Sequence, residues 1–225
     1  MNVVALIPAF NEASRIGATV RAVRAIEGVS TVLVIDDGSA DETAAVARGA
    51  GAEVLTLERN AGKGAALAAG LERIRADVDV VVLLDADLEE SAVQAASLLE
   101  PVTSGDADMS IATFPRPTGK AGFGFVMRLA RWGIRRFGGD FDAGAPLSGQ
   151  RALNRRAVEA VLPIAAGYGV EVALTIRALR AGLRLVEIPT TMAHAATGRD
   201  LAGFVHRGRQ FLDVAGALVR IALRG

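Results

Sequence analysis

Short apolar runs alternate with longer, alanine-rich amphipathic stretches along the first half of the chain. The runs lack polar alternation, so each predicts a strand that is buried on both faces of a sheet. Strands are expected at 3–7, 31–36, 53–57, 79–84 and 109–113. Helices are expected between them, at 13–25, 41–49, 63–75 and 91–99. This alternation predicts an α/β fold with one mostly parallel, Rossmann-like sheet flanked by helices.

The pattern loosens after Thr113, where prolines and glycines interrupt the chain. Further elements are expected in this order: a helical stretch 123–136, a Gly-rich turn 138–149, a helix 169–181, a strand 184–189 and an amphipathic helix of about 201–224. We interpret residues 1–225 as one domain with three parts: a nucleotide-binding half 1–113, an acceptor-side half 114–199 and a C-terminal amphipathic helix 200–225.

Two of the predicted strands run directly into acidic residues. Asp85 and Asp87 follow the apolar run 80–84, and Asp36 and Asp37 follow the run 32–35. Carboxyl ends of parallel strands are where such sheets bind ligands, and carboxylate oxygens suit Mg²⁺ or Mn²⁺ bridging a diphosphate. The alternative for Asp85 and Asp87 is that both cap a helix. We favour the ligand interpretation, because unpaired carboxylates beside a buried strand are costly.

The loops after the first and second strands carry further polar candidates. Pro8, Ala9, Asn11 and Glu12 follow the first strand, where main-chain and side-chain groups can hydrogen-bond a base or a ribose. A simple turn with an Asn cap is the alternative. Asp36 either accepts a ribose hydroxyl or caps a helix. Ser39 with Glu42 three residues later predicts a capping box at the start of the second helix.

The segment 60–64 reads Asn-Ala-Gly-Lys-Gly. It places the Lys63 cation and the backbone amides around Gly62 at a helix N-terminus, which favours phosphate. It is not a Walker loop, because Leu57 stands where the first glycine is needed and Gly64 where Ser or Thr is needed. No Gly-x-Gly-x-x-Gly motif follows the first strand, which disfavours a nicotinamide enzyme.

The second half supplies isolated candidates. Gln150 and Arg151 belong to a compact polar turn, in which Arg151 either holds a phosphate or acceptor group or lies on the surface. Glu171 is a candidate general base or a favourable acid in a first helical turn. His194 is a candidate third metal ligand, although a lone histidine is more often structural, and Arg199 is a candidate phosphate ligand.

Composition narrows the class of protein. The chain carries 25 basic and 25 acidic residues, so no overall field argues for nucleic acid. The absence of cysteine removes disulfides and thiolate chemistry and fits a reducing compartment. No secretion signal is visible, and no apolar run approaches the ~20 residues that cross a bilayer. A cytoplasmic location is expected, with a peripheral place at the inner face of the membrane left open.

The motifs taken together resemble the family 2 glycosyltransferases with the GT-A fold. Four segments occur in the family's order: 7–12, 35–39, 60–64 and 84–87. The branch of polyprenyl-phosphate sugar synthases is similar, although Glu89 and Gln150 depart from its motifs. The resemblance implies a nucleotide-sugar donor, with base and ribose near Pro8, Glu12 and Asp37 and the metal diphosphate at Asp85-Ala86-Asp87. A likeness to glucosyl-phosphoglycerate synthases implies His194 as a further metal ligand.

We therefore predict a metal-dependent enzyme that moves a hexose from a nucleotide-diphosphate sugar, a UDP-sugar, to a hydroxyl or polyprenyl-phosphate acceptor. Asp87 and Asp85 would position the cation, and Glu171 would act as base toward a hydroxyl. A nucleotidyltransferase and a catalytically silent nucleotide-sugar-binding protein are the alternatives. The expected partners are the donor and a small-molecule or lipid-phosphate acceptor, but no nucleic acid. Peripheral membrane contact through the last helix and a homodimer remain open.

Overall fold

The computed structural model describes residues 1–114, 124–164, 169–192 and 214–222. The chain forms a seven-stranded sheet in the order β3-β2-β1-β4-β6-β5-β7. Its strands are β1 (Val3–Ala9), β2 (Val29–Asp36), β3 (Glu53–Thr56), β4 (Val80–Leu83), β5 (Met109–Thr113), β6 (Arg151–Asn154) and β7 (Leu185–Pro189). Neighbouring strands pair in parallel, except that β6 runs antiparallel to both β4 and β5. The predicted α/β class and mostly parallel sheet are confirmed.

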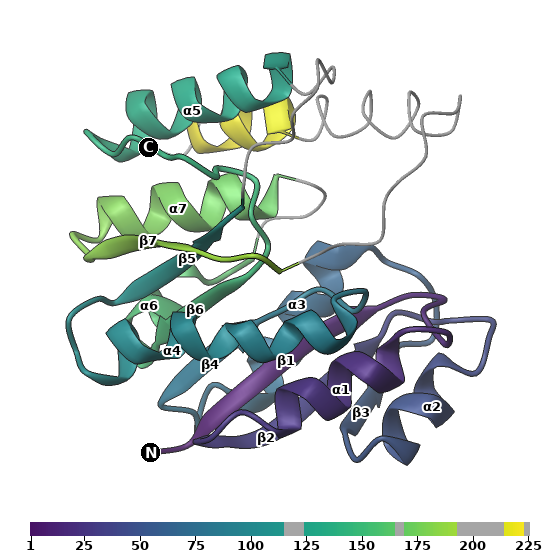
Figure 1. Ribbon diagram of the computed structural model, residues 1–225. Helices are drawn as coiled ribbons and strands as arrows, with labels where there is room; N and C mark the ends of the chain where they lie inside the picture. The colour runs from purple at the N-terminus through teal and green to yellow at the C-terminus, as the bar shows by residue number, and fades with distance from the viewer. Residues whose placement is uncertain (115–123, 165–168, 193–213, 223–225) are drawn as a thin grey trace.

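The helices cover both faces of this sheet (Figure 1). They are α1 (Ile16–Arg24), α2 (Thr43–Gly49), α3 (Lys63–Ile74), η1 (Glu89–Ala95), α4 (Ala96–Thr103), α5 (Gly124–Gly138), α6 (Arg155–Val161) and α7 (Val170–Arg180). Alternate residues of β1 belong to different cores. Val3, Ala5 and Ile7 pack with α1, η1 and α4, whereas Val4 and Leu6 pack with α3, α6 and α7. Burial on both faces explains why the strands are continuously apolar.

A third cluster lies beyond α7, at the end of the molecule farthest from α2 (Figure 1). Here α5 packs against α7 and against residues 214–222, which are helical. Val214 and Leu218 of this last segment are buried at 0% and 4% exposure. The described part of the expected C-terminal helix therefore packs on the protein core, while 200–213 and 223–225 lie outside the described residues. None of the helices in the described ranges has the length and apolar character that a membrane crossing requires.

The sequence-based assignment differs from the structure at two elements. Residues 148–151 were expected to form a polar turn followed by no strand, yet β6 begins at Arg151 and α6 follows it. The reason is that β6 has only four residues and opens with an arginine, which gives no apolar run to recognise. The helix expected at 91–99 is also divided into the 3₁₀ helix η1 and the α-helix α4.

Close packing between α3 and the sheet predicts a large response at Gly70. A Cβ added there would lie 2.6 Å from Leu6 Cδ1 and 2.8 Å from Ile35 Cδ1. Overpacking costs about 1–3 kcal/mol, and alanine gains ~1 kcal/mol over glycine in a helix. Because Leu6 and Ile35 are both fully buried, we expect a cost of about 2–3 kcal/mol. Gly70→Ala should therefore lower the free energy of unfolding by about 1–2 kcal/mol in urea titrations.

Gly49→Ala is the matched control, since Gly49 is also helical and a Cβ there would meet nothing within 4 Å. It should be as stable as the wild type or slightly more so. Equal stability of Gly70→Ala and Gly49→Ala would show that α3 can shift away from the sheet at no cost.

Candidate active site

The predicted polar residues gather at one edge of the sheet, where β1, β2 and β4 end. The loops leaving these strands are tied to one another. Asp37 N donates to Ala9 O at 2.8 Å, and Leu57 N donates to Asp36 O at 2.8 Å. Parallel pairing of the strands places their carboxyl ends together, as the sequence predicted.

Lys63 lies at the centre of this edge, at the first residue of α3. Its Nζ is 2.7 Å from Asp85 Oδ1 and 3.0 Å from Glu171 Oε1. Gln150 Nε2 donates to the other oxygen of Asp85, at 2.6 Å. Four candidates that are far apart in the sequence are thus joined in one network: the Lys63 ammonium, two carboxylates and an amide.

The two carboxylates of this network keep Lys63 protonated. Burial by itself would lower the pKa of the ammonium, but the carboxylates of Asp85 and Glu171 outweigh burial and raise the pKa above its ordinary value. Lys63 is therefore a fixed cation at neutral pH. A cation at a helix N-terminus is suited to meet an incoming phosphate group.

Gly149 leaves space beside this network. A Cβ at this position would lie 2.6 Å from Lys63 Nζ and 3.1 and 3.2 Å from the two carboxylate oxygens of Asp85. A side chain at this position would push the Lys63 ammonium away from its present place and crowd Asp85. The loop before β6 is anchored to β7, because Glu187 accepts hydrogen bonds from Gly144 N and Ala145 N, both at 3.0 Å.

The Asp85-Ala86-Asp87 turn is supported by a residue that the sequence analysis missed. The hydroxyl of Thr19 donates to Ala86 O at 2.8 Å and accepts from Glu89 N at 2.8 Å. Thr19 is fully buried in α1. A hydroxyl at an otherwise apolar position of an amphipathic helix was the signal that could have identified it.

The loop after β1 contacts the loop after β2. Asn11 has a left-handed backbone (φ 55°), its N–H donates to Ser39 Oγ at 2.9 Å, and its side-chain oxygen accepts from Ala40 N at 2.9 Å. Asn11 therefore does not cap α1. The predicted capping box is wrong as well, because α2 begins at Thr43 and the Ser39 hydroxyl is bonded to Asn11.

Other candidates in these loops already have protein partners. Asp37, 3% exposed, accepts from Ala61 N and Gly62 N at 2.9 and 2.8 Å, so these two amides bind a carboxylate rather than lying open. Asp36 Oδ1 accepts from Ser39 N at 3.1 Å. The Glu12 carboxylate lies 2.6 Å from Arg15 Nη2. These contacts fix the shape of the loops around Pro8 and Ala9, which end β1.

Arg151 is fully buried at the start of β6 rather than on the surface. Its guanidinium donates to Ser148 O at 2.9 Å and to Thr175 Oγ1 at 2.8 Å. Burial lowers the pKa of Arg151 to about 10, against the opposing effect of Glu171 and Glu187. Nη2 of Arg151 is buried with no hydrogen-bond partner among the described residues. Arg151 thus holds the turn that carries Gly149 and Gln150.

Two candidates cannot be placed. His194 and Arg199 lie outside the described residues. Across the part of the chain that the structure describes, no group of at least three His, Cys, Asp or Glu side chains is gathered as a metal site. Asp85 and Asp87 are the candidate ligands that the described residues contain.

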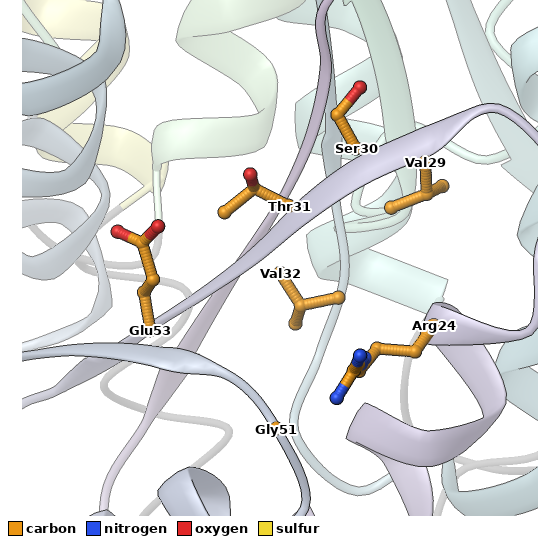
Figure 2. A pocket seen from close by; sticks show the side chains of 7 residues that line it. All are labelled: Arg24, Val29, Ser30, Thr31, Val32, Gly51 and Glu53. Carbon is orange, nitrogen blue, oxygen red and sulfur yellow. The ribbon is translucent and has the colours of Figure 1, made fainter.

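A separate cavity of about 230 Å³ lies at the opposite edge of the sheet (Figure 2). Arg24, Ser30, Thr31 and Glu53 contribute to its wall. Because it opens at the amino ends of β2 and β3, it does not belong to the cluster around Lys63.

Comparison with known proteins defines the class of this site. The family model described as glycosyl transferase family 2 matches residues 4–162. The chain belongs to this family, which places it among the glycosyltransferase enzymes, and the GT-A fold expected from the sequence is confirmed. The match runs from β1 through α6 and includes the loops that carry Lys63, Asp85 and Gln150.

Three proteins illustrate the similarity. Glycosyltransferase AglJ of Haloferax volcanii is 32% identical to this chain in an alignment that covers 87% of this chain and 64% of AglJ. The undecaprenyl-phosphate mannosyltransferase of Micrococcus luteus is 31% identical, with 89% of this chain and 87% of that protein covered. Glucosyl-3-phosphoglycerate synthase of Mycobacterium tuberculosis, solved with Mn²⁺, UDP and glucosyl-3-phosphoglycerate, has a TM-score of 0.80 at 25% identity, with coverage of 98% and 79%. Both branches suggested by the sequence are thus represented.

Proposed function

We propose that the protein transfers a hexose from a UDP-sugar, with a divalent cation bound at Asp85 and Asp87. The observation that carries this proposal is the network at the end of β4, in which Asp85 is held between Lys63 and Gln150. It is supported by the M. tuberculosis synthase, which was solved with Mn²⁺ and UDP and shares the fold. In this proposal the base and ribose lie among the residues at the carboxyl ends of β1 and β2 and in the loops that follow. These residues are Pro8, Ala9, Asn11, Glu12, Asp36 and Asp37.

The residues present fit a hard cation. Asp85 and Asp87 offer carboxylate oxygens, the ligands that Mg²⁺ and Mn²⁺ prefer. Gly149 adds no side chain beside Asp85. The two Asp85 oxygens accept from Lys63 and Gln150, so a bound cation would replace one of these contacts. When bound, the cation would offset the negative charge that develops on the departing diphosphate. Lys63 would contribute a second positive charge from the protein itself.

We infer that the acceptor is a lipid phosphate. Glu171, the candidate base, is held by Lys63 at 3.0 Å and would have to leave this ion pair before it could take a proton. A phosphate acceptor is already ionised and needs no base, and in that case Glu171 serves to hold Lys63 in place. The similarity to the M. luteus undecaprenyl-phosphate enzyme supports this choice.

A small phosphorylated hydroxyl acceptor is the second candidate, because the structural similarity to the phosphoglycerate enzyme extends over 98% of the chain. Incubation of the protein with radiolabelled UDP-glucose and Mn²⁺ separates the two. Label that enters the butanol phase only when a polyprenyl phosphate is added supports the lipid acceptor. Label that enters a water-soluble product with 3-phosphoglycerate supports the second candidate. Formation of UTP from UDP-glucose and added pyrophosphate, or no transfer to either acceptor, would contradict both.

A further inference from the structure

Helix α5 has an unusual exposed face. Phe125 and Trp132 are 77% and 56% exposed. Arg128, Arg135 and Arg136 are exposed as well. The spacings of three, seven, ten and eleven residues from Phe125 place all five side chains on one side of a helix with 3.6 residues per turn. Two large aromatic side chains and three arginines therefore share one surface, which we call the α5 face.

The orientation of this face is fixed by what lies behind it. Val126, Ala130 and Ile134 are buried against α7 and the segment 214–222. Gly133 allows the closest approach, because a Cβ there would lie 2.3 Å from Leu218 Cδ2. The helix cannot roll without breaking this packing. Figure 1 shows α5 at the outer end of the molecule, beyond α7 and the last helical segment.

The charge of the α5 face has one sign. The segment Gly124–Gly138 contains four arginines and no acidic residue. Arg131 is engaged with the backbone, donating to Ala143 O at 2.9 Å and Gly144 O at 3.0 Å. Among the described residues, no carboxylate forms a salt bridge with Arg128, Arg135 or Arg136. The positive charge of these three side chains is therefore available to a partner.

Trp132 and Arg136 both contact the ring of Phe137. Trp132 meets Phe137 edge to face, with ring centroids 5.9 Å apart, and the Arg136 guanidinium lies 5.4 Å from the centre of the Phe137 ring. Exposed tryptophan and phenylalanine beside arginines are typical of helices that lie in the boundary layer of a lipid bilayer. There the rings enter the headgroup region while the guanidinium groups stay with the lipid phosphates.

We propose that the α5 face docks on an anionic lipid surface. A second copy of the chain fits this face less well, because a two-fold contact would bring the arginines of one copy against those of the other. The docked helix is connected to the active site through Arg131, which holds the loop that leads to Gly149 and Gln150. The idea that docking brings the active site to a lipid-phosphate acceptor rests on the proposed function. The docking of the α5 face on lipid does not depend on that function.

The single tryptophan of the chain, Trp132, provides a direct reporter. Fluorescence is recorded with vesicles of phosphatidylcholine alone and with vesicles in which about 30 mol% of the lipid is anionic phosphatidylglycerol. We expect a blue shift with the anionic vesicles only, weakened by added salt. The triple variant Arg128→Gln/Arg135→Gln/Arg136→Gln should bind about a hundredfold more weakly, at about fivefold per arginine.

The matched control is Arg21→Gln/Arg48→Gln/Arg73→Gln, which removes the same charge from exposed positions on α1, α2 and α3. It should bind vesicles like the wild type, and Phe125→Ala should bind more weakly. Equal binding by both triple variants, or no binding to anionic vesicles, would overturn the proposal. So would a blue shift that depends on protein concentration without lipid, which indicates self-association, or a shift with RNA but not with vesicles. UDP titration of each variant shows separately whether the donor site is intact.

Discussion

Replacing Asp87 with alanine is expected to lower kcat/KM for sugar transfer by about a thousandfold or more, which corresponds to about 4 kcal/mol of transition-state stabilisation. Asp87 is one of two candidate cation ligands among the described residues, and it follows the strand end that Thr19 supports through Ala86. Losing a ligand weakens the charge that offsets the departing diphosphate. Release of UDP from a UDP-sugar, measured against Mn²⁺ concentration, checks this expectation.

Asp77→Ala is the matched control for this variant. Asp77 is an exposed acid that lies just before β4, at the opposite end of that strand from Asp87. It should leave both activity and metal dependence unchanged. An Asp87→Ala enzyme that retains more than about a tenth of wild-type activity would show that this carboxylate neither binds the cation nor contacts the reacting groups.

Lys63→Met should have the second-largest effect, on stability and on activity together. It removes the ammonium that lies within 3.0 Å of both Asp85 and Glu171 and leaves the two carboxylates without it. Breaking a buried pair costs about 3–5 kcal/mol, and the partial exposure of Lys63 should reduce this to about 2 kcal/mol. We also expect activity to fall by at least about a hundredfold, since removal of one stabilising donor at a transition state has that effect.

A double-mutant cycle with Glu171→Gln tests the ion pair itself. The variant Lys63→Met/Glu171→Gln should be less destabilised than the sum of the single changes, because the neutral amide no longer needs a cation.

The contribution of Lys63 to stability should depend on pH with a defined sign. The pKa of Lys63 is raised, so its pairing is present in full below the ordinary lysine pKa and is lost only at higher pH. Urea unfolding between about pH 6 and 9 should therefore show a constant difference between wild type and Lys63→Met.

The predictable part of the fold follows from local patterns. Runs such as Val80–Leu83 lie buried on both faces of the sheet, and this burial is visible in the sequence as uninterrupted apolar character. β6 was missed because Arg151 opens it and its partners, Ser148 O and Thr175, are 3 and 24 positions away. A buried arginine is stabilised by tertiary hydrogen bonds, which leave no mark in a hydrophobic pattern.

In the candidate site, too, local sequence patterns predicted some features and tertiary contacts set the others. Asp85 and Lys63 were identified from the elements that carry them, but their ion pair was not predicted. Gln150 and Asp85 are 65 residues apart in the sequence, and their contact depends on the antiparallel insertion of β6 beside β4. Only the order of strands in the sheet brings these groups together. Gly149 belongs to the site for the same reason, whereas Thr19 reaches it from α1 through its hydrogen bonds to Ala86 and Glu89.

Calorimetric titration of the full chain with UDP and GDP, each with and without Mn²⁺, tests the central claim most directly. We expect UDP to bind measurably in the presence of Mn²⁺ and at least about tenfold more weakly without the cation. GDP should bind more weakly than UDP. UDP binding of equal strength with and without Mn²⁺, or no binding of UDP under either condition, would contradict a cation-dependent UDP-sugar site at Asp85 and Asp87.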